Sequence, residues 1–254
     1  MKTIFTLFVC TLFAPLLQAQ TLNTDSLLKV ASALEEGAQE EASLTDYLAV
    51  LKASPLNYEA NWHTSFLYSK IGNRQTNPDT KKQDFVTAKL YAVKALKLNP
   101  SDAEANYVMA VAMGRMALLL GGQDKVDAAN DIKRYVDLAL KSNPNHAGAW
   151  HVLGKWHYEI ATLSWVEKQA ANMFLGGIDG TGSLAESVNC YKKAIALSPA
   201  YILYYLDLAI TYVQQGDKPN AISTLQKALS LPVKTEDDPM YLKQCQLLLN
   251  NIQH

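Results

Sequence analysis

The chain has 254 residues, of which 49% are hydrophobic and 19% are charged, and these fractions are typical of a globular protein and exclude a disordered one. Its 23 lysines and arginines against 24 aspartates and glutamates give a formal net charge of −1, so the sequence predicts neither a nucleic-acid partner nor attraction to an anionic membrane. Three cysteines are too few for a zinc ribbon or a framework of disulfides, and no motif requires an enzyme, a metal or a cofactor.

The N-terminal segment has the pattern of a secretory signal peptide. Lys2 precedes an apolar run from Ile4 to Leu17, and the small residue Ala19 marks a plausible cleavage point. The run is shorter than the roughly 20 residues that a membrane span needs, and Pro15 interrupts it. We therefore predict a signal peptide at residues 1–19 and an exported protein, periplasmic or secreted, with no stable membrane insertion after cleavage. An uncleaved anchor is the alternative.

Two cysteines, Cys190 and Cys245, remain in the predicted mature chain. Because export leads to an oxidising compartment, these two residues either form a disulfide or lie as small buried side chains on separate helices. We favour the second interpretation.

A phrase that ends in proline recurs along the rest of the chain. Residues 95–100 read Ala-Leu-Lys-Leu-Asn-Pro, residues 139–144 read Ala-Leu-Lys-Ser-Asn-Pro, and residues 194–199 read Ala-Ile-Ala-Leu-Ser-Pro. Weaker copies end at Pro55 and Pro232. Because proline disfavours the helical conformation in the residue before it, each phrase is predicted to end a helix.

Aromatic and small residues follow these prolines at fixed offsets, as in tetratricopeptide repeats. The residues that fit this pattern are Trp150, Leu153 and Gly154 after Pro144, and Tyr205, Leu208, Ala209 and Tyr212 after Pro199. Pro199 and Pro232 are 33 positions apart, close to the repeat length of about 34 residues. The other intervals are longer, and we interpret the excess as insertions near the turn inside each helix pair, at residues 73–82 and 161–182 among others.

The sequence therefore predicts an all-α fold, a tetratricopeptide-type α-solenoid in which antiparallel helix pairs form a right-handed superhelix between N- and C-terminal capping helices. Residues 20–254 would form one domain. Its expected parts are an N-terminal helix pair at 24–55, repeat 1 at 56–100, repeat 2 at 101–144, repeat 3 at 145–199 with an insertion at 161–182, repeat 4 at 200–232, and a C-terminal capping helix at 238–252. Capping boxes are expected to open helices at Ser101 to Glu104 and at Ser183 to Glu186.

Repeat 3 carries a more specific resemblance. Residues 149–156 read Ala-Trp-His-Val-Leu-Gly-Lys-Trp and residues 161–168 read Ala-Thr-Leu-Ser-Trp-Val-Glu-Lys. With residues 228–237, these phrases resemble the regulator of microtubule dynamics proteins over roughly residues 91–249. The resemblance implies a helical-repeat adaptor and no catalytic residue. Animal members of that family are linked to microtubules and organelle surfaces. Because the signal peptide predicts export, we expect an exported bacterial member that keeps the fold and the scaffold role alone.

Three other features are candidate sites of chemistry. His146, His151 and His157 lie close in sequence, but their spacing does not suit a helical zinc site, so ordinary positions in a repeat are favoured. The glycine-rich stretch 176–183 lacks the residues of a phosphate-binding loop and is favoured as a flexible connection. Trp150 is expected in the core, whereas Trp165 would wall a pocket if the insertion folds back over the solenoid.

The first helix of each pair lines the concave surface in such solenoids, and this register gives the candidate binding residues. They are His63, Tyr107, Arg115, His151, Lys155, Tyr158 and Glu159. Charged members would orient a partner and aromatic members would supply contact area, a mixture that suits a peptide. The alternative is that some of these residues only pack against the N-terminal helices.

We therefore predict a non-enzymatic scaffold that binds a peptide or partner protein on the concave face. The second hypothesis is a structural subunit of a cell-envelope complex that uses its convex face or its C-terminal helix. The third is an enzyme with two histidines or carboxylates in a closed pocket beside Trp165.

Overall fold

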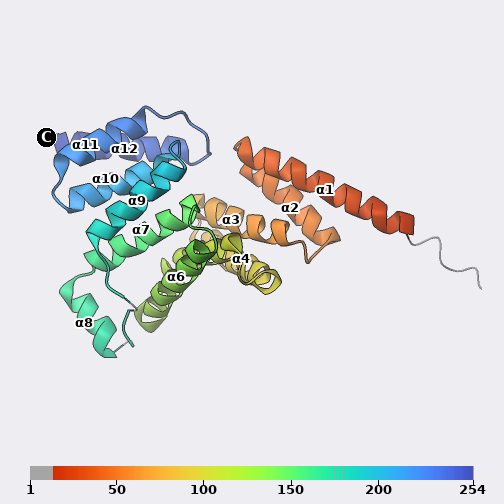
Figure 1. Ribbon diagram of the computed structural model, residues 1–254, viewed down its shortest axis with the longest axis horizontal. Helices are drawn as coiled ribbons and strands as arrows, with labels where there is room; N and C mark the ends of the chain where they lie inside the picture. The colour runs from red at the N-terminus through yellow and green to blue at the C-terminus, as the bar shows by residue number, and fades with distance from the viewer. Residues whose placement is uncertain (1–13, 175, 179, 254) are drawn as a thin grey trace, which may run out of the picture.

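The computed structural model describes residues 14–174, 176–178 and 180–253, and all the regular structure in these residues is helical (Figure 1). The helices are α1 (Ala14–Glu36), α2 (Glu40–Ala53), α3 (Tyr58–Arg74), α4 (Pro78–Leu98), α5 (Ala103–Ala117), α6 (Gly122–Ser142), α7 (Ala147–Thr162), α8 (Trp165–Phe174), α9 (Leu184–Leu197), α10 (Ile202–Gln214), α11 (Lys218–Leu229) and α12 (Asp238–Gln253). The all-α prediction is confirmed.

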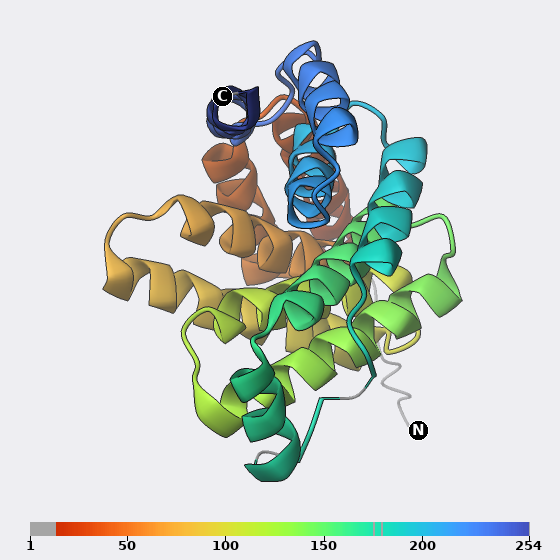
Figure 2. The same ribbon diagram turned by 90° about the vertical axis from the view of Figure 1, so that its left-hand side faces the viewer.

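The helices pack as consecutive hairpins. Contacts join α1 to α2, α3 to α4, α5 to α6, α7 to α9, and α10 to α11. Helix α12 covers the end of the stack by packing on α10 and α11, and α8 stands apart with its contacts to α6. Figure 2 shows the hairpins winding one after another into a superhelix. This is the arrangement of a tetratricopeptide-type solenoid with helices at both ends.

The first helices of the pairs form the inner side of the stack. Helix α3 packs on α5, α5 on α7, and α7 on α10, whereas the second helices α4, α6, α9 and α11 have no comparable contacts among themselves in the described residues. Because successive elements on the inside of a curve lie closer together than those outside, the first helices face inward. We call the surface formed by α3, α5, α7, α10 and the start of α12 the inner face.

The recurring prolines lie just after helices, as predicted. The helices α2, α4, α6 and α9 end two residues before Pro55, Pro100, Pro144 and Pro199. Close helix approach depends on the small residues of the repeat pattern. A Cβ atom on Gly154 of α7 would lie 2.8 Å from the ring of Tyr191 on α9, so only glycine permits this contact.

One of the two predicted capping boxes needs correction. Ser183 caps α9, and its Oγ accepts a hydrogen bond from the Glu186 backbone N–H at 3.3 Å. At α5, however, the cap is Asp102 instead of Ser101, and its carboxylate accepts from the Glu104 N–H at 2.8 Å. Aspartate is as good an N-cap as serine, and the helix begins one residue later.

The extra length of repeat 1 lies elsewhere than in the insertion predicted at residues 73–82. Helices α4 and α6 each have 21 residues, against 12 for α11 in the repeat of normal length. The polar stretch 73–82 is divided between the end of α3, a short connection and the start of α4. In repeat 3 the region 161–182 contains α8. The additional residues therefore mostly lengthen helices.

Most of the predicted signal peptide, residues 1–19, lies outside the described residues, and α1 runs without a break from Ala14 to Glu36.

The two cysteines of the described residues do not form a disulfide. Cys190 and Cys245 are free, buried, and belong to different core clusters, which is the interpretation favoured above. Burial raises the pKa of both thiols to about 11, so they stay protonated near neutral pH.

Candidate functional site

The seven candidate residues divide into a packed group and an accessible group. Helix α3 carries His63, α5 carries Tyr107 and Arg115, and α7 carries His151, Lys155, Tyr158 and Glu159. The packed group comprises His63, Tyr107 and His151, and the other four form the accessible group.

His63 is engaged with the N-terminal helices. Its Nδ1 lies 2.7 Å from Oε2 of Glu35, and its ring stacks on Tyr47 and Trp62 with centroids 4.5 and 3.4 Å away. Its side chain is 13% exposed. His63 therefore joins α1, α2 and α3, which is the packing role named as the alternative.

Tyr107 joins successive first helices. Its ring centroid lies 5.7 Å from that of Phe66 on α3 and 4.5 Å from that of His146, and it fills the notch above Gly148 on α7. Burial raises the pKa of its hydroxyl well above the usual value. The ring is thus part of the packing between repeats as well as part of the inner face.

His151 forms a buried pair with Asp207 of α10. Its Nε2 lies 2.7 Å from Oδ2 of Asp207, and its ring stacks on Tyr204 at 4.8 Å. Burial alone would raise the pKa of the Asp207 carboxyl, but the His151 hydrogen bond and charge, together with nearby Lys155 and Arg115, lower it overall. Asp207 is therefore ionised near neutral pH and ties α7 to α10.

Arg115 is the cation of the inner face that lacks an ion-pair partner. Its Nη1 donates to Oδ1 of Asn73 at 3.1 Å, while its Nε is buried without a hydrogen-bond partner. In the part of the chain that the structure describes, no carboxylate forms an ion pair with it. A partly desolvated guanidinium that is hydrogen-bonded only to a neutral amide oxygen keeps its positive charge and is an attractive site for an anion.

Lys155, Tyr158 and Glu159 lie along one side of α7. Lys155 Nζ is 3.1 Å from Oε1 of Glu159 and 5.2 Å from the Tyr158 ring centroid. The Lys155 and Glu159 side chains are 45% and 58% exposed, so both remain available to a partner. Because exposed pairs at this spacing are weak, a ligand can displace this ion pair at little cost.

Four inner-face residues were missed in the sequence analysis. They are Tyr201, Tyr204, Asp207 and Tyr241. Burial raises the pKa of the three tyrosine hydroxyls, and the electrostatic effect of Arg115 reaches Tyr201 and Tyr241. The sequence does single out Asp207 as a candidate, since it is the one charged residue of the mostly apolar helix α10.

A cluster of charges closes the inner face by joining the two ends of the superhelix. We call Glu40, Lys70, Arg74, Glu236 and Asp237 the clasp. Arg74 Nη1 lies 2.6 Å from Oε2 of Glu40 and 3.2 Å from Oδ1 of Asp237, and Lys70 pairs with Glu40 as well. The Glu40 backbone N–H donates to Oε1 of Glu236 at 2.7 Å. Figure 1 shows the α11–α12 loop beside the start of α2.

Two of the other sequence candidates, His146 and Trp150, have structural roles. His146 caps α7 by accepting from the Ala149 N–H at 3.0 Å, and Trp150 donates from Nε1 to the Pro144 carbonyl at 2.8 Å. Trp165, by contrast, is 73% exposed on α8. Among the described residues, no group of three His, Cys, Asp or Glu side chains is placed to hold a metal.

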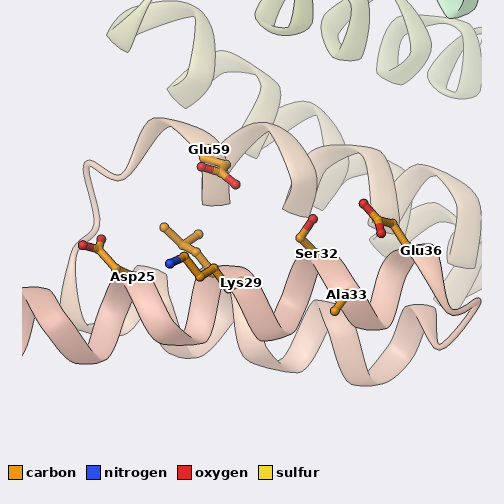
Figure 3. Close-up of a pocket in the computed structure, with 7 residues that line it drawn as sticks. Asp25, Lys29, Ser32, Ala33, Glu36 and Glu59 are labelled. Carbon is orange, nitrogen blue, oxygen red and sulfur yellow. The ribbon is translucent and has the colours of Figure 1, made fainter.

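A hollow lies away from the residues of the inner face that are described above. It has a volume of about 470 Å³ and runs along α1, with Glu59 of α3 on its far side (Figure 3). Three acidic residues, Asp25, Glu36 and Glu59, and one lysine, Lys29, line it. The hollow is open and touches none of the seven candidate residues.

Within the described part of the chain, no helix is both long and apolar enough to cross a membrane.

Comparisons with known proteins agree with this architecture. The family model described as Regulator of microtubule dynamics protein 1-3 matches residues 27–253. Human regulator of microtubule dynamics protein 2 is 25% identical over 92% of this chain, which spans 58% of that relative. Bovine regulator of microtubule dynamics protein 1 is 26% identical over 91% of this chain and 73% of its own length.

Two solved structures share the fold. A thermophilic TPR protein of Thermus thermophilus superposes with a TM-score of 0.65 at 16% identity, covering 88% of this chain and 99% of that one. Pseudomonas aeruginosa pilF gives a TM-score of 0.55 at 8% identity, covering 92% of this chain and 88% of that one.

Proposed function

The chain belongs to the regulator of microtubule dynamics protein family, and from that premise we propose that it is a non-catalytic scaffold that binds a peptide segment or a partner protein along its inner face. Because this chain spans 58% of the human relative, the partners of the whole relatives are not carried over.

The observation that carries the proposal is the chemistry of the inner face. The charge of Arg115 acts on the hydroxyls of Tyr107 on α5, Tyr201 just before α10 and Tyr241 on α12, and Lys155 with Glu159 provides an exposed charged rim. Tyrosine and arginine together contribute much of the binding energy at protein interfaces. A helical stack that presents them inward on four successive helices offers an extended contact surface to a partner.

The test compares charge reversals on the two sides of the stack. Lys155→Glu changes the exposed rim of the inner face, and Lys141→Glu makes the same change at an exposed position of the outer helix α6. Each variant is used as bait in affinity capture from the host. We expect Lys155→Glu to reduce recovery of the principal partner about tenfold, because like charges in an interface are strongly unfavourable. Equal loss from Lys141→Glu would contradict the proposal.

One observation favours a second function, a structural subunit that assembles through its outer surface. Helix α8 exposes Trp165, Val166 and Met173, at 73%, 66% and 69%. Exposed apolar side chains grouped on one short helix are typical of an interaction surface. The replacement Trp165→Ser would then abolish assembly of the complex, measured by size-exclusion chromatography of native extracts, while Lys155→Glu would leave it intact.

Export is also proposed, from the pattern of residues 1–19. Cleavage after Ala19 would leave α1 starting at Gln20, within the helix that the structure describes. Mass spectrometry of the protein purified from its host measures this directly. A mature mass that still includes residues 1–19 would exclude cleavage.

A further inference from the structure

We propose that Arg115 anchors a carboxylate of the bound segment, so that the inner face selects acidic peptides. This inference deepens the proposed function and rests on it. Its basis is the difference between Arg115 and the other two arginines of the chain.

Those two arginines are neutralised within the protein. Arg74 pairs with Glu40 at 2.6 Å, and Arg134 pairs with Asp131 at 2.7 Å. Arg115 instead donates from Nη1 to the Asn73 amide oxygen at 3.1 Å and leaves its Nε buried and unpartnered. A buried donor without an acceptor is costly, and an ionised donor most of all. The Nε itself is closed to a ligand, so an incoming carboxylate would pair with the terminal Nη atoms and compensate the charge there.

The acids of the inner face are already committed to other cations. Asp207 is paired with His151 at 2.7 Å, and Asp237 is paired with Arg74 at 3.2 Å. Arg115 helps to lower the pKa of the Asp207 carboxyl, but it forms an ion pair with neither of these two acids. The guanidinium of Arg115 therefore keeps a local positive charge that a ligand can use.

Tyrosine hydroxyls also lie near the guanidinium. Tyr107, Tyr201 and Tyr241 lie within its electrostatic reach. Elsewhere, tyrosine hydroxyls serve the fold: that of Tyr58 donates to Asp102, and that of Tyr205 donates to the Pro199 carbonyl. Because burial holds the hydroxyls near Arg115 in the protonated form, they can donate to a carboxylate. Guanidinium with phenol is a donor set that favours a planar anion over a neutral amide.

The experiment measures binding of three pools of short fluorescent peptides to the full chain. The first pool has a fixed glutamate and an amidated C-terminus, the second has glutamine in place of that glutamate, and the third has glutamine and a free C-terminal carboxylate. We expect the first or the third pool to bind at least about tenfold more tightly than the second, which is the effect of one charge-assisted hydrogen bond or more. The first and third pools distinguish a side-chain carboxylate from a chain terminus.

Variants then assign the preference to Arg115. Arg115→Gln should abolish it, and Arg115→Lys should lose most of it, because lysine keeps the charge and lacks the planar donor fork. Arg134→Gln removes the same charge from the outer helix α6 and should leave the preference intact. Thermal melts verify that all three variants are folded.

The outcomes separate the two levels of the proposal. If all three pools bind equally tightly, the scaffold function stands and the carboxylate anchor is wrong. A preference that survives in Arg115→Gln likewise overturns the role of Arg115. If no pool binds, peptide recognition itself fails, and the carboxylate anchor fails with it.

Discussion

The clasp and the Arg115 region lie on the same surface, yet the cations of the clasp are paired with carboxylates whereas Arg115 is not. In the clasp, two cations meet three carboxylates over short distances, and Glu40 is only 1% exposed. Around Arg115, one cation donates to an amide oxygen and acts electrostatically on Asp207, Tyr201 and Tyr241 without an ion pair. Removal of one member of a buried ion pair destabilises the fold, because it leaves the other charge buried without a partner. Removal of a charge that has no ion-pair partner carries no such cost. The clasp therefore serves the fold, and Arg115 is left for a ligand.

The largest expected effect comes from breaking the clasp. Glu40→Gln removes the carboxylate that Lys70 and Arg74 share, and we expect a loss of about 3 kcal/mol in the free energy of unfolding. Urea denaturation measures it. The control is Glu41→Gln, because the Glu41 side chain is 66% exposed and should contribute less than about 0.5 kcal/mol. Equal effects of the two variants would show that the clasp does not stabilise the fold.

A smaller effect is expected at the His151–Asp207 pair. Asp207→Asn replaces a charge-assisted hydrogen bond with a neutral one and should cost about 2 kcal/mol near neutral pH. Because the pKa of Asp207 is lowered in the folded protein, the unfolded state takes up its proton first on acidification. The stabilisation is therefore full above the ordinary aspartate pKa and is lost as the pH falls through the lowered one. A stability difference between wild type and variant that grows on acidification would contradict this assignment.

The smallest effect on stability is expected at Arg115 itself. Arg115→Gln loses the bond to Asn73 but also removes a partly buried charge, and these two contributions oppose each other. We expect a change within about 0.5 kcal/mol in the free energy of unfolding, as for replacements that break no buried pair. A loss as large as that of Glu40→Gln would mean that Arg115 has a structural role, and the contrast with the clasp would disappear.

The fold could be predicted from the sequence because its signals are local. Each proline phrase marks a helix end within a few residues, and small residues such as Gly154 mark where helices approach. Arg115 and Lys155 were placed on the inner face by the same register. The extra length of α4 was misassigned because a polar stretch such as 73–82 predicts a loop and an exposed helical turn equally well.

The clasp could not be predicted in the same way. Glu40 and Glu236 lie 196 positions apart, and their contact depends on the accumulated curvature of every hairpin between them. No local pattern distinguishes Glu40 from its exposed neighbour Glu41. His63 posed a similar problem, because its position fits the inner face but its partner, Glu35, lies on a helix outside the repeats.

A stack whose two ends are tied should not fray as an open one does. In an open repeat array each unit depends only on its neighbours, so terminal hairpins exchange their amide hydrogens faster than central ones. Here the α11–α12 loop is tied both to α2, through the Glu40 backbone N–H, and to α3, through Arg74, so opening of an end must break these contacts. Both termini should therefore share one protection level in hydrogen exchange, and a truncation at either end should loosen the opposite end as much as the hairpin next to it.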